Sequence, residues 1–231
     1  MSYDDMRLKI GLYTSWYEEE LAIVNLAIHS DPDNVSAYSR KGDLLHFFLG
    51  RSEEALAAYD RALELDPKTA KTYCNKASAL NSLGRSDEAL DLYDRAIELD
   101  PNDAAPYSNK GNALSDLQRY QEALNAYEQA VRLDPGNIWA YSNKASALNN
   151  LGHYEQALEI LNEVVLLDPD NPIVHNNRAY AFYHLQHYQE ALDACDQMLS
   201  LDPDNEFAHN LKEEILAVEP NSEKTDGENS I

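Results

Sequence analysis

The sequence predicts an all-α protein built from tandem helical hairpins, and three observations lead to this fold class. Asp-Pro pairs recur about every 34 residues, small residues recur at fixed places within that period, and larger apolar residues recur at helical spacings. A period of this length is typical of stacked arrays whose repeats share one elongated core. We therefore look for function on a repetitive surface rather than in a single cleft.

The Asp-Pro pairs set the repeat boundaries. If each repeat ends two residues after its pair, six repeats follow, at 1–34, 35–69, 70–103, 104–137, 138–171 and 172–205. The second repeat carries one extra residue, near Phe47-Phe48. Residues 206–218 are expected to form a C-terminal capping helix, with Phe207, Leu211 and Ile215 on one apolar face. Residues 219–231 are polar and acidic, which is typical of a disordered tail.

Each repeat is predicted to contain two helices joined by a tight turn. Glycine marks the turn in three repeats, because glycine tolerates a left-handed backbone. Ser52 and Ser86 are expected to cap second helices, and the Asp before each proline is expected to end them. The residue before each first helix can accept a hydrogen bond from a free amide; these residues are Asn34, Thr69, Asp103, Asn137, Asn171 and Asn205.

Small residues on facing helices would let the helix axes approach closely. They are Gly42, Ala77, Gly111, Ala145 and Ala179 in the first helices, and Ala55, Ala89, Ala123, Ala157 and Ala191 in the second. Around them recur larger groups such as Tyr59, Tyr93 and Tyr127, each worth roughly 1.5–3 kcal/mol if fully buried. A single repeat could not offset its ordering entropy, but a stack of several can.

The chain of 231 residues carries a formal net charge of −23, from 41 acidic and 18 basic residues. Such a chain repels nucleic acid and anionic lipid at long range, so neither is expected as a partner. The charge keeps an elongated protein soluble, or it favours a basic partner.

Two cysteines far apart in sequence, Cys74 and Cys195, fit a reducing compartment better than a disulfide framework. The N-terminal residues lack the pattern of an export signal, and no apolar stretch is long enough to span a bilayer. We therefore expect a cytoplasmic protein.

The pattern resembles the tetratricopeptide repeat family. The third complete repeat shows it best, in the run from Tyr107 to Leu114, then Tyr120-Gln121-Glu122-Ala123-Leu124, and then Tyr127, Ala130 and Pro135. The resemblance covers about residues 35–205 and implies a right-handed α-solenoid, a superhelix with a concave groove lined by the first helices. Residues 1–34 depart from the pattern, because Glu20 replaces the small alanine and the first helix is weak, and are interpreted as a degenerate N-terminal capping repeat.

The resemblance also indicates which residues would line the groove. The sixth position of successive repeats holds Arg40, Asn75, Asn109, Asn143 and Asn177, and Asn112 lies at a ninth position. An asparagine amide both donates and accepts hydrogen bonds, so this row could pair with the backbone of an extended peptide. The alternative is that repeat duplication alone produced the row.

Aromatic residues gather toward the C-terminal half of the expected groove. Trp139, Tyr180, Tyr183 and His184 fall on or near the lining, where their faces could anchor an apolar side chain. The alternative is that some of them pack between repeats.

A row of basic residues follows the asparagines, at Lys41, Lys76, Lys110, Lys144 and Arg178. Their stems could cover the seams between repeats while the charged ends reach a neighbouring acid, or the row could bind a partner. The chaperone-tail clamp of the family needs basic residues at fifth positions, where this chain has none, and Lys71 and Arg40 are isolated. We therefore expect no such clamp.

Signals of catalysis are poor. The chain has no glycine-rich phosphate loop and no nucleophile turn, and His184 and His187 lack an evident third metal ligand. Cys74 could be accessible in the groove, whereas Cys195 replaces a core tyrosine. No cofactor, metal or catalytic residue is expected. The sequence thus predicts a non-catalytic adaptor that holds an extended segment of another protein. A self-assembling scaffold, joined through the groove or an end repeat, is the alternative.

Overall fold

The computed structural model describes the backbone of residues 3–222 and the side chains of residues 14–217. The described residues are helical throughout, apart from short turns. They divide into two compact units, an N-terminal unit up to Arg119 and a C-terminal unit from Tyr120.

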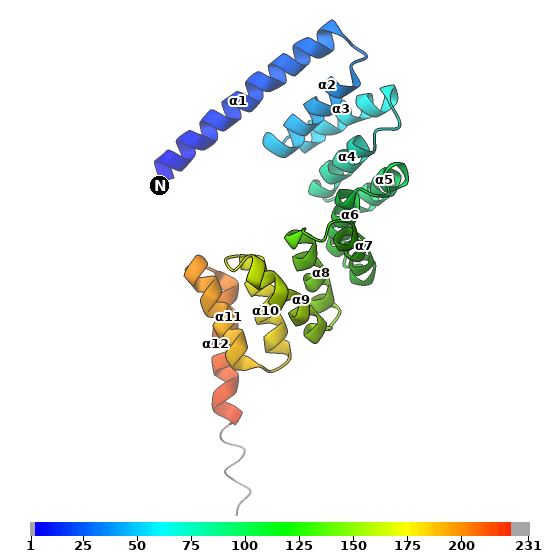
Figure 1. Cartoon of the computed structure of the whole chain (residues 1–231). Coiled ribbons are helices and arrows are strands. Elements are labelled where there is room, and N and C mark those ends of the chain that lie inside the picture. Colours follow the sequence, from blue (N-terminus) through cyan, green and yellow to red (C-terminus); the bar gives the residue numbers. More distant parts are fainter. Residues whose placement is uncertain (1–2, 223–231) are drawn as a thin grey trace, which may run out of the picture. The chain divides into compact units, whose positions relative to one another are not determined.

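The N-terminal unit consists of a long helix, α1 (Tyr3–Ser30), followed by helical hairpins (Figure 1). The first hairpin joins α2 (Val35–Asp43) and a π-helical turn, η1 (Leu44–Phe48), to α3 (Ser52–Leu65). The second pairs α4 (Ala70–Ser82) with α5 (Ser86–Leu99), and α6 (Ala104–Asp116) follows. Each helix packs on its predecessor, and α4 also contacts α2 and α6, so the first helices of successive repeats adjoin.

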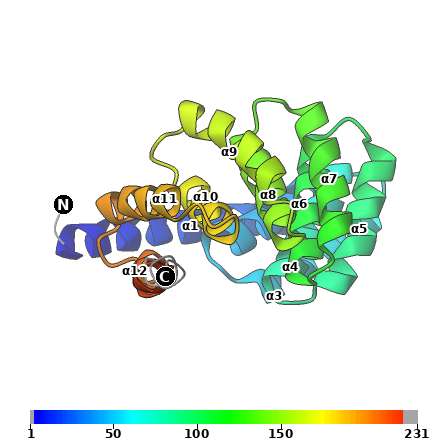
Figure 2. The ribbon, with the colours of Figure 1, turned by 90° about the horizontal axis from the view of Figure 1, so that it is seen from below.

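The C-terminal unit continues the same order of elements (Figure 2). It contains α7 (Tyr120–Leu133), α8 (Ile138–Asn150), α9 (Tyr154–Leu167), α10 (Pro172–His184), α11 (Tyr188–Leu201) and α12 (Glu206–Ser222). Here too the first helices α8 and α10 contact each other. No helix in the described part of the chain combines the length and the apolar character that crossing a membrane requires.

The predicted helix caps are largely confirmed. The side chains of Asn34, Asp103, Asn137, Asn171 and Asn205 accept hydrogen bonds from amides in the first turn of the following helix. Thr69 is an exception, because its hydroxyl donates to Asp66 instead. The prediction for Ser52 and Ser86 is wrong, since both are the first helical residues and follow arginines that make no side-chain cap.

The turns between helices need a left-handed backbone in every complete repeat. Gly50, Gly84 and Gly152 have φ values of 66°, 74° and 78°. Gln118 and Gln186 take the same role in the two repeats that lack glycine, with φ values of 58° and 61°. A non-glycine residue pays a steric cost there, so sequence reasoning based on glycine could not find these two turns.

The small positions of the second helices form the centre of the core, as predicted. Ala55, Ala89, Ala123, Ala157 and Ala191 are all fully buried. The larger residues beside them, Tyr59, Tyr93, Tyr127, Leu161 and Cys195, are at most 2% exposed. Buried alanines allow the two helices of a hairpin to lie close, and the larger residues fill the space between repeats.

The predicted extra residue near Phe47-Phe48 is accommodated by η1. The amide of Leu49 donates to the carbonyl of Leu44, five residues back, at 3.0 Å. The wider turn absorbs one residue without shifting the core positions on either side. Just before this turn there is little room at Gly42, where an added Cβ would lie 2.4 Å from the Tyr59 ring.

The N-terminal repeat differs from the prediction of a degenerate hairpin. Residues 3–30 form the single helix α1, which Figure 1 shows as longer than any other helix. Ser15 lies where the other repeats have their left-handed turn residue, and no proline or glycine interrupts the chain there. Because nothing ends the helix at this point, it continues.

The C-terminal helix packs on the last repeat. Leu211 and Ile215 are buried, and Phe207 packs against the same cluster, which includes Cys195 and Met198. The helix extends to Ser222, four residues beyond the predicted boundary. The rest of the predicted disordered tail, residues 223–231, lies outside the described residues.

Candidate functional site

The first helices of the N-terminal unit enclose a surface pocket of about 400 Å³. We call it the N-terminal groove. It lies between α2 and α4, and its lining consists of Val35, Ser36, Ser39, Arg40, Asp43, Asp66, Thr69, Lys71, Thr72 and Asn75. Two predicted site residues, Arg40 and Asn75, are therefore brought together. Arg40 and Lys71, which stand alone with respect to the positions of a chaperone-tail clamp, both line this groove.

Hydrogen bonds between the two helices order the groove. The hydroxyls of Ser39 and Thr72 lie 3.0 Å apart. Asp43 accepts from the Asn75 amide at 2.8 Å and from the buried Tyr59 hydroxyl at 2.9 Å. Burial, together with the nearby Asp43 carboxylate, raises the pKa of Tyr59, so the phenol remains a donor. The groove thus has a preformed polar floor.

The two cations of the groove differ in their surroundings. The Arg40 guanidinium donates to Glu20 of α1 at 2.9 and 2.5 Å, and it lies 5.9 Å from the centre of the Phe48 ring. Lys71 is exposed and makes no ion pair within the described part of the chain. Arg40 is therefore part of the framework, and Lys71 is the side chain better placed to meet a partner.

The asparagine row joins neighbouring repeats. Asn75 donates to Asp43, Asn109 donates to the Cys74 sulfur at 3.6 Å, and Asn177 donates to the Ser142 carbonyl at 3.3 Å. In each case the acceptor belongs to the first helix of the preceding repeat. Each bond uses one amide hydrogen and does not involve the amide oxygen. These three asparagines therefore join the first helices of neighbouring repeats, and the binding of a peptide by the row stays a prediction.

Asn112 on α6 and Asn143 on α8 are half-buried and take part in interactions of their own. Another asparagine, Asn149, supports the row from α8, because its amide donates to the Asn177 carbonyl at 2.9 Å. These bonds hold the first helices of the C-terminal unit side by side.

An aromatic cluster forms on the C-terminal unit. His184 stacks on Tyr154, with ring centres 4.8 Å apart and planes within 5°, and it also contacts Tyr180 at 4.4 Å and Tyr183 at 5.4 Å. We call these four residues the C-terminal aromatic face. Tyr154 was missed by the sequence analysis. The sequence pattern that could have identified it is a tyrosine that recurs at the start of three second helices, at Tyr120, Tyr154 and Tyr188.

The predicted aromatic residues differ in how tightly they are held. The Tyr183 hydroxyl donates to Glu214 on α12, which raises the pKa of Tyr183. Burial raises the pKa of Tyr180, so both phenols stay neutral at physiological pH. Trp139, in the first turn of α8, is 59% exposed. It is the large apolar side chain of the predicted set that is most available to a partner.

The basic row lies at the seams between repeats. Lys76 pairs with Asp60 at 2.5 Å, Lys110 with Asp94 at 2.5 Å, and Lys144 with Glu128 at 3.5 Å. Lys212 of α12 pairs in the same way with Asp196. In each pair, the acid lies on the second helix of the preceding repeat. This supports the interpretation that the lysine stems cover seams, although Lys41 and Arg178 do not follow the rule.

Both cysteines are buried. The expectation that Cys74 is accessible is wrong, because its side chain is 5% exposed and Asn109 of the next repeat covers it. Burial raises the pKa of each thiol to about 11, which keeps it protonated and unreactive. Within the described residues, no group of three histidine, cysteine or acidic side chains could hold a metal ion.

Comparison with known families identifies the class of protein. Family models described as tetratricopeptide repeat match residues 33–102, 68–136, 114–181 and 172–205. Together they span residues 33–205, and the chain belongs to the tetratricopeptide repeat family. Repeats of this kind are protein–protein interaction modules, which sets the general function. The comparison with curated proteins gave no match.

Solved structures agree with this assignment. The chain is 25% identical to YrrB, described as a TPR protein with an unusual peptide-binding site, with a TM-score of 0.68 over 82% of this chain and 97% of that chain. A tetratricopeptide repeat protein from Parabacteroides merdae is 18% identical, with a TM-score of 0.72 over 96% and 88%. PilF from Pseudomonas aeruginosa is 23% identical, with a TM-score of 0.70 over 82% and 86%. The last two similarities show the fold alone.

Proposed function

We propose that the chain is a non-catalytic adaptor that holds an extended segment of another protein on its first helices. The observation that carries this proposal is the N-terminal groove, a pocket of about 400 Å³ with a polar floor and an exposed lysine beside it. Supporting it, the similar protein YrrB is described as having a peptide-binding site.

The groove has the chemistry that an extended backbone needs. Ser36 and Ser39 provide hydroxyls that both donate and accept, and Lys71 provides a cation for a carbonyl or a carboxylate. The Lys71 ammonium attracts an anionic group of a partner at short range. At long range, the net charge of −23 repels nucleic acid. We therefore propose a partner segment that is neutral or basic overall and carries single acidic or carbonyl groups toward Lys71.

The C-terminal unit offers a second set of contacts. Trp139 and Tyr180 present aromatic faces on the first helices α8 and α10, which suits an apolar side chain of the bound segment. Aromatic residues with one exposed face are the usual anchors of such contacts. The affinity is expected to be modest, roughly micromolar, because a flexible segment must order on binding.

The test is selection from a displayed library of random peptides against the full chain. Trp139→Ala or Lys71→Ala is expected to weaken the selected peptides on the order of ten-fold. Lys68→Ala is the matched control, since Lys68 is exposed and outside the groove lining. Peptides that bind the wild type and both variants equally would contradict the proposal.

A second candidate function, self-assembly, is favoured by one face of α1. Ile23 and Ala27 lie where α3 has Ala58 and Ala62, which are 5% and 0% exposed because the first helix of the hairpin covers them. In α1 that covering helix is missing, and Ile23 is 66% exposed beside Trp16 at 54%. We propose that a second copy could cover this face.

Light scattering across a concentration series tests this alternative. A mass that rises with concentration for the wild type, but not for Ile23→Glu, would support self-assembly. A strict monomer at all concentrations would exclude it and leave the adaptor.

A further inference from the structure

The ion pairs at the seams follow a fixed rule that Lys41 and Arg178 break, and a pocket opens beside Lys41. Lys76, Lys110, Lys144 and Lys212 each pair with an acid sixteen residues earlier in the chain. At the same spacing, Lys41 meets Asn25, which carries no charge. Lys41 has no ion pair within 4.0 Å among the side chains that the structure describes.

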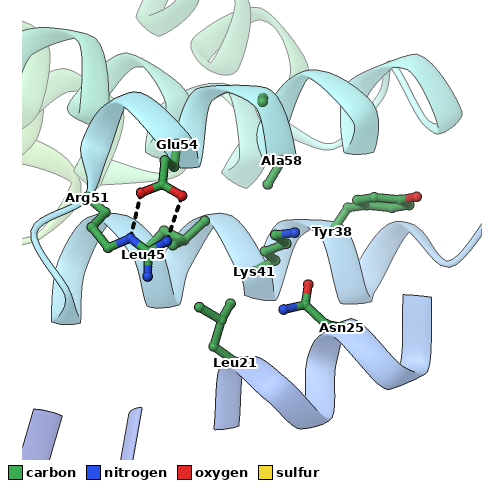
Figure 3. Close-up of a pocket in the computed structure, with 9 residues that line it drawn as sticks. Leu21, Asn25, Tyr38, Lys41, Leu45, Arg51, Glu54 and Ala58 are labelled. Atoms are coloured by element: carbon green, nitrogen blue, oxygen red, sulfur yellow. Dashed lines mark hydrogen bonds and ion pairs between the residues drawn. The ribbon is translucent and has the colours of Figure 1, made fainter. Parts of the chain in front are cut away.

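A pocket of about 370 Å³ lies beside Lys41. In Figure 3, Leu21 and Asn25 of α1 and Ala58 of α3 lie around Lys41 on α2, and Glu54 of α3 faces Arg51. We call this the Lys41 pocket, and its full lining is Leu21, Asn25, Tyr38, Lys41, Leu45, Arg51, Glu54, Ala57 and Ala58. It shares no residue with the N-terminal groove, so it is a separate site on a different face of α2.

Two substitutions in the repeat pattern distinguish this seam, one that removes a charge and one that reduces a side chain to a methyl group. Ala57 lies at the position that Asp91, Asn125, Glu159 and Asp193 hold in the later repeats. Asn25 has the size of the aspartates that hold this position at three other seams, but it lacks the charge that would draw Lys41 onto α1. The seam therefore keeps its cation but loses the acidic groups that occupy it elsewhere.

The acid that remains in the lining already has a partner. Arg51 donates to both oxygens of Glu54 at 2.6 Å, and the guanidinium lowers the pKa of that carboxyl. Arg51 makes the larger contribution to keeping Glu54 ionised, and the nearby Lys41 ammonium adds to it without forming an ion pair. The polar groups open to a ligand are the Lys41 ammonium and the Asn25 amide.

We propose that the Lys41 pocket binds a carboxylate carried on a short aliphatic chain. The ammonium and the amide are donors for the carboxylate, and Leu21, Leu45, Ala57 and Ala58 form an apolar wall for the methylene groups. Both a glutamate side chain of a partner and a free short-chain fatty acid have this chemistry. The site stands independently of the groove proposal.

The probes are sodium butyrate and the blocked peptide acetyl-Ala-Glu-Ala-amide, titrated into the ¹⁵N-labelled full chain. The expected result is a saturable shift of the Asn25 side-chain amide and the Lys41 backbone amide in ¹H–¹⁵N spectra, absent with sodium chloride at equal ionic strength. Saturation by the peptide alone would assign the ligand to a protein side chain, and saturation by butyrate alone to a free acid.

Asn25→Asp restores the arrangement of the other seams, so the variant should fold normally. The new carboxylate should form an ion pair with Lys41. It is expected to raise the dissociation constant by at least about ten-fold. The matched control is Asn162→Asp, which adds the same charge at the equivalent place before Arg178 in the C-terminal unit. The proposal is overturned if chloride produces the same shifts, if Asn162→Asp weakens binding equally, or if the glutamine analogue of the peptide binds as tightly.

Discussion

The two units of this chain use one repeat pattern for different surfaces. The N-terminal unit has 21 acidic and 13 basic residues, whereas the C-terminal unit has 20 acidic and only 5 basic, which gives net charges of −8 and −15. The first helices of the N-terminal unit carry polar groups hydrogen-bonded to Asp43, and those of the C-terminal unit carry aromatic rings around His184. The core alanines are buried in both.

The difference shows which positions are fixed by packing and which are not. The second helices supply the same buried alanines in all five complete repeats, and asparagines join first helices in both units. The residue that begins the second helix is serine in two repeats of the N-terminal unit and tyrosine throughout the C-terminal unit. The residues that begin the second helices therefore differ between repeats, whereas the buried core alanines are the same.

The largest expected effect is at Gly42, a position special to the N-terminal unit. Gly42→Ala would bring a Cβ to 2.4 Å from the Tyr59 ring, and we expect it to lower the free energy of unfolding by about 1–3 kcal/mol. Urea unfolding, with hydrogen exchange of α2 and α4, measures the loss. In the C-terminal unit, the equivalent positions hold Ala145 and the smaller Leu161, which are both buried.

That natural pair supplies the control. Gly42→Ala combined with Tyr59→Leu should recover part of the lost stability, because the added methyl group then has space. If the double variant is less stable than the sum of the two single changes, overpacking at Gly42 is not the reason.

The second effect concerns the C-terminal aromatic face. Tyr154→Ser introduces the serine that begins two second helices of the N-terminal unit, and it removes the ring that stacks on His184. Loss of this aromatic pair should lower the free energy of unfolding by about 0.5–1.5 kcal/mol. Tyr154→Phe keeps the ring and should change little. Calorimetric unfolding compares the two variants, and equal losses would show that the hydroxyl, not the stack, matters.

A smaller effect of opposite sign is expected at Gln186. This residue holds a left-handed backbone, with φ of 61°, where the equivalent turn of the preceding repeat has glycine. Gln186→Gly should raise the free energy of unfolding by about 0.5–1 kcal/mol, because relief of the steric cost exceeds the entropy that glycine adds to the unfolded chain. Gly152→Gln should lower the free energy of unfolding by a similar amount. If both variants change the free energy of unfolding in the same direction, this explanation is contradicted.

The smallest effect depends on pH and belongs to η1. Burial lowers the pKa of His46 below its ordinary 6.5, and its ring nitrogens contact the hydroxyls of Ser52 and Ser78. The unfolded chain then binds more protons, so the stability of the N-terminal unit should fall as pH drops below about 6.5. Urea unfolding of the wild type and His46→Gln from neutral to mildly acidic pH checks this, and parallel profiles would exclude His46 as a cause.

Much of the fold followed from the spacing of a few residue types. The Asp-Pro pairs and the small residues of each helix located the hairpins, and the one-residue shift between Leu45 and Leu49 located the π-helical turn. The continuous helix α1 could not be foreseen by analogy with the other repeats, because a helix ends only where the sequence interrupts it and Ser15 does not. Left-handed turns at glutamine were equally hidden, since tertiary packing rather than local preference sets them.

The candidate site was harder to predict than the fold. Repeat positions correctly placed Arg40 and Asn75 on the first helices, but not the bonds that commit Arg40 to Glu20 and Asn75 to Asp43. Those bonds join residues twenty or more positions apart and depend on side-chain direction. The structure was needed to show that Lys71 and Trp139 are the accessible side chains, because their neighbours make bonds within the chain.

The central claim is that a partner segment lies along the first helices, and hydrogen exchange of the full chain with a selected peptide tests it most directly. The account predicts slower exchange in α2 and α4, or in α8 and α10, with no change in α5 and α11. Protection confined to second helices, or to α1, would contradict it.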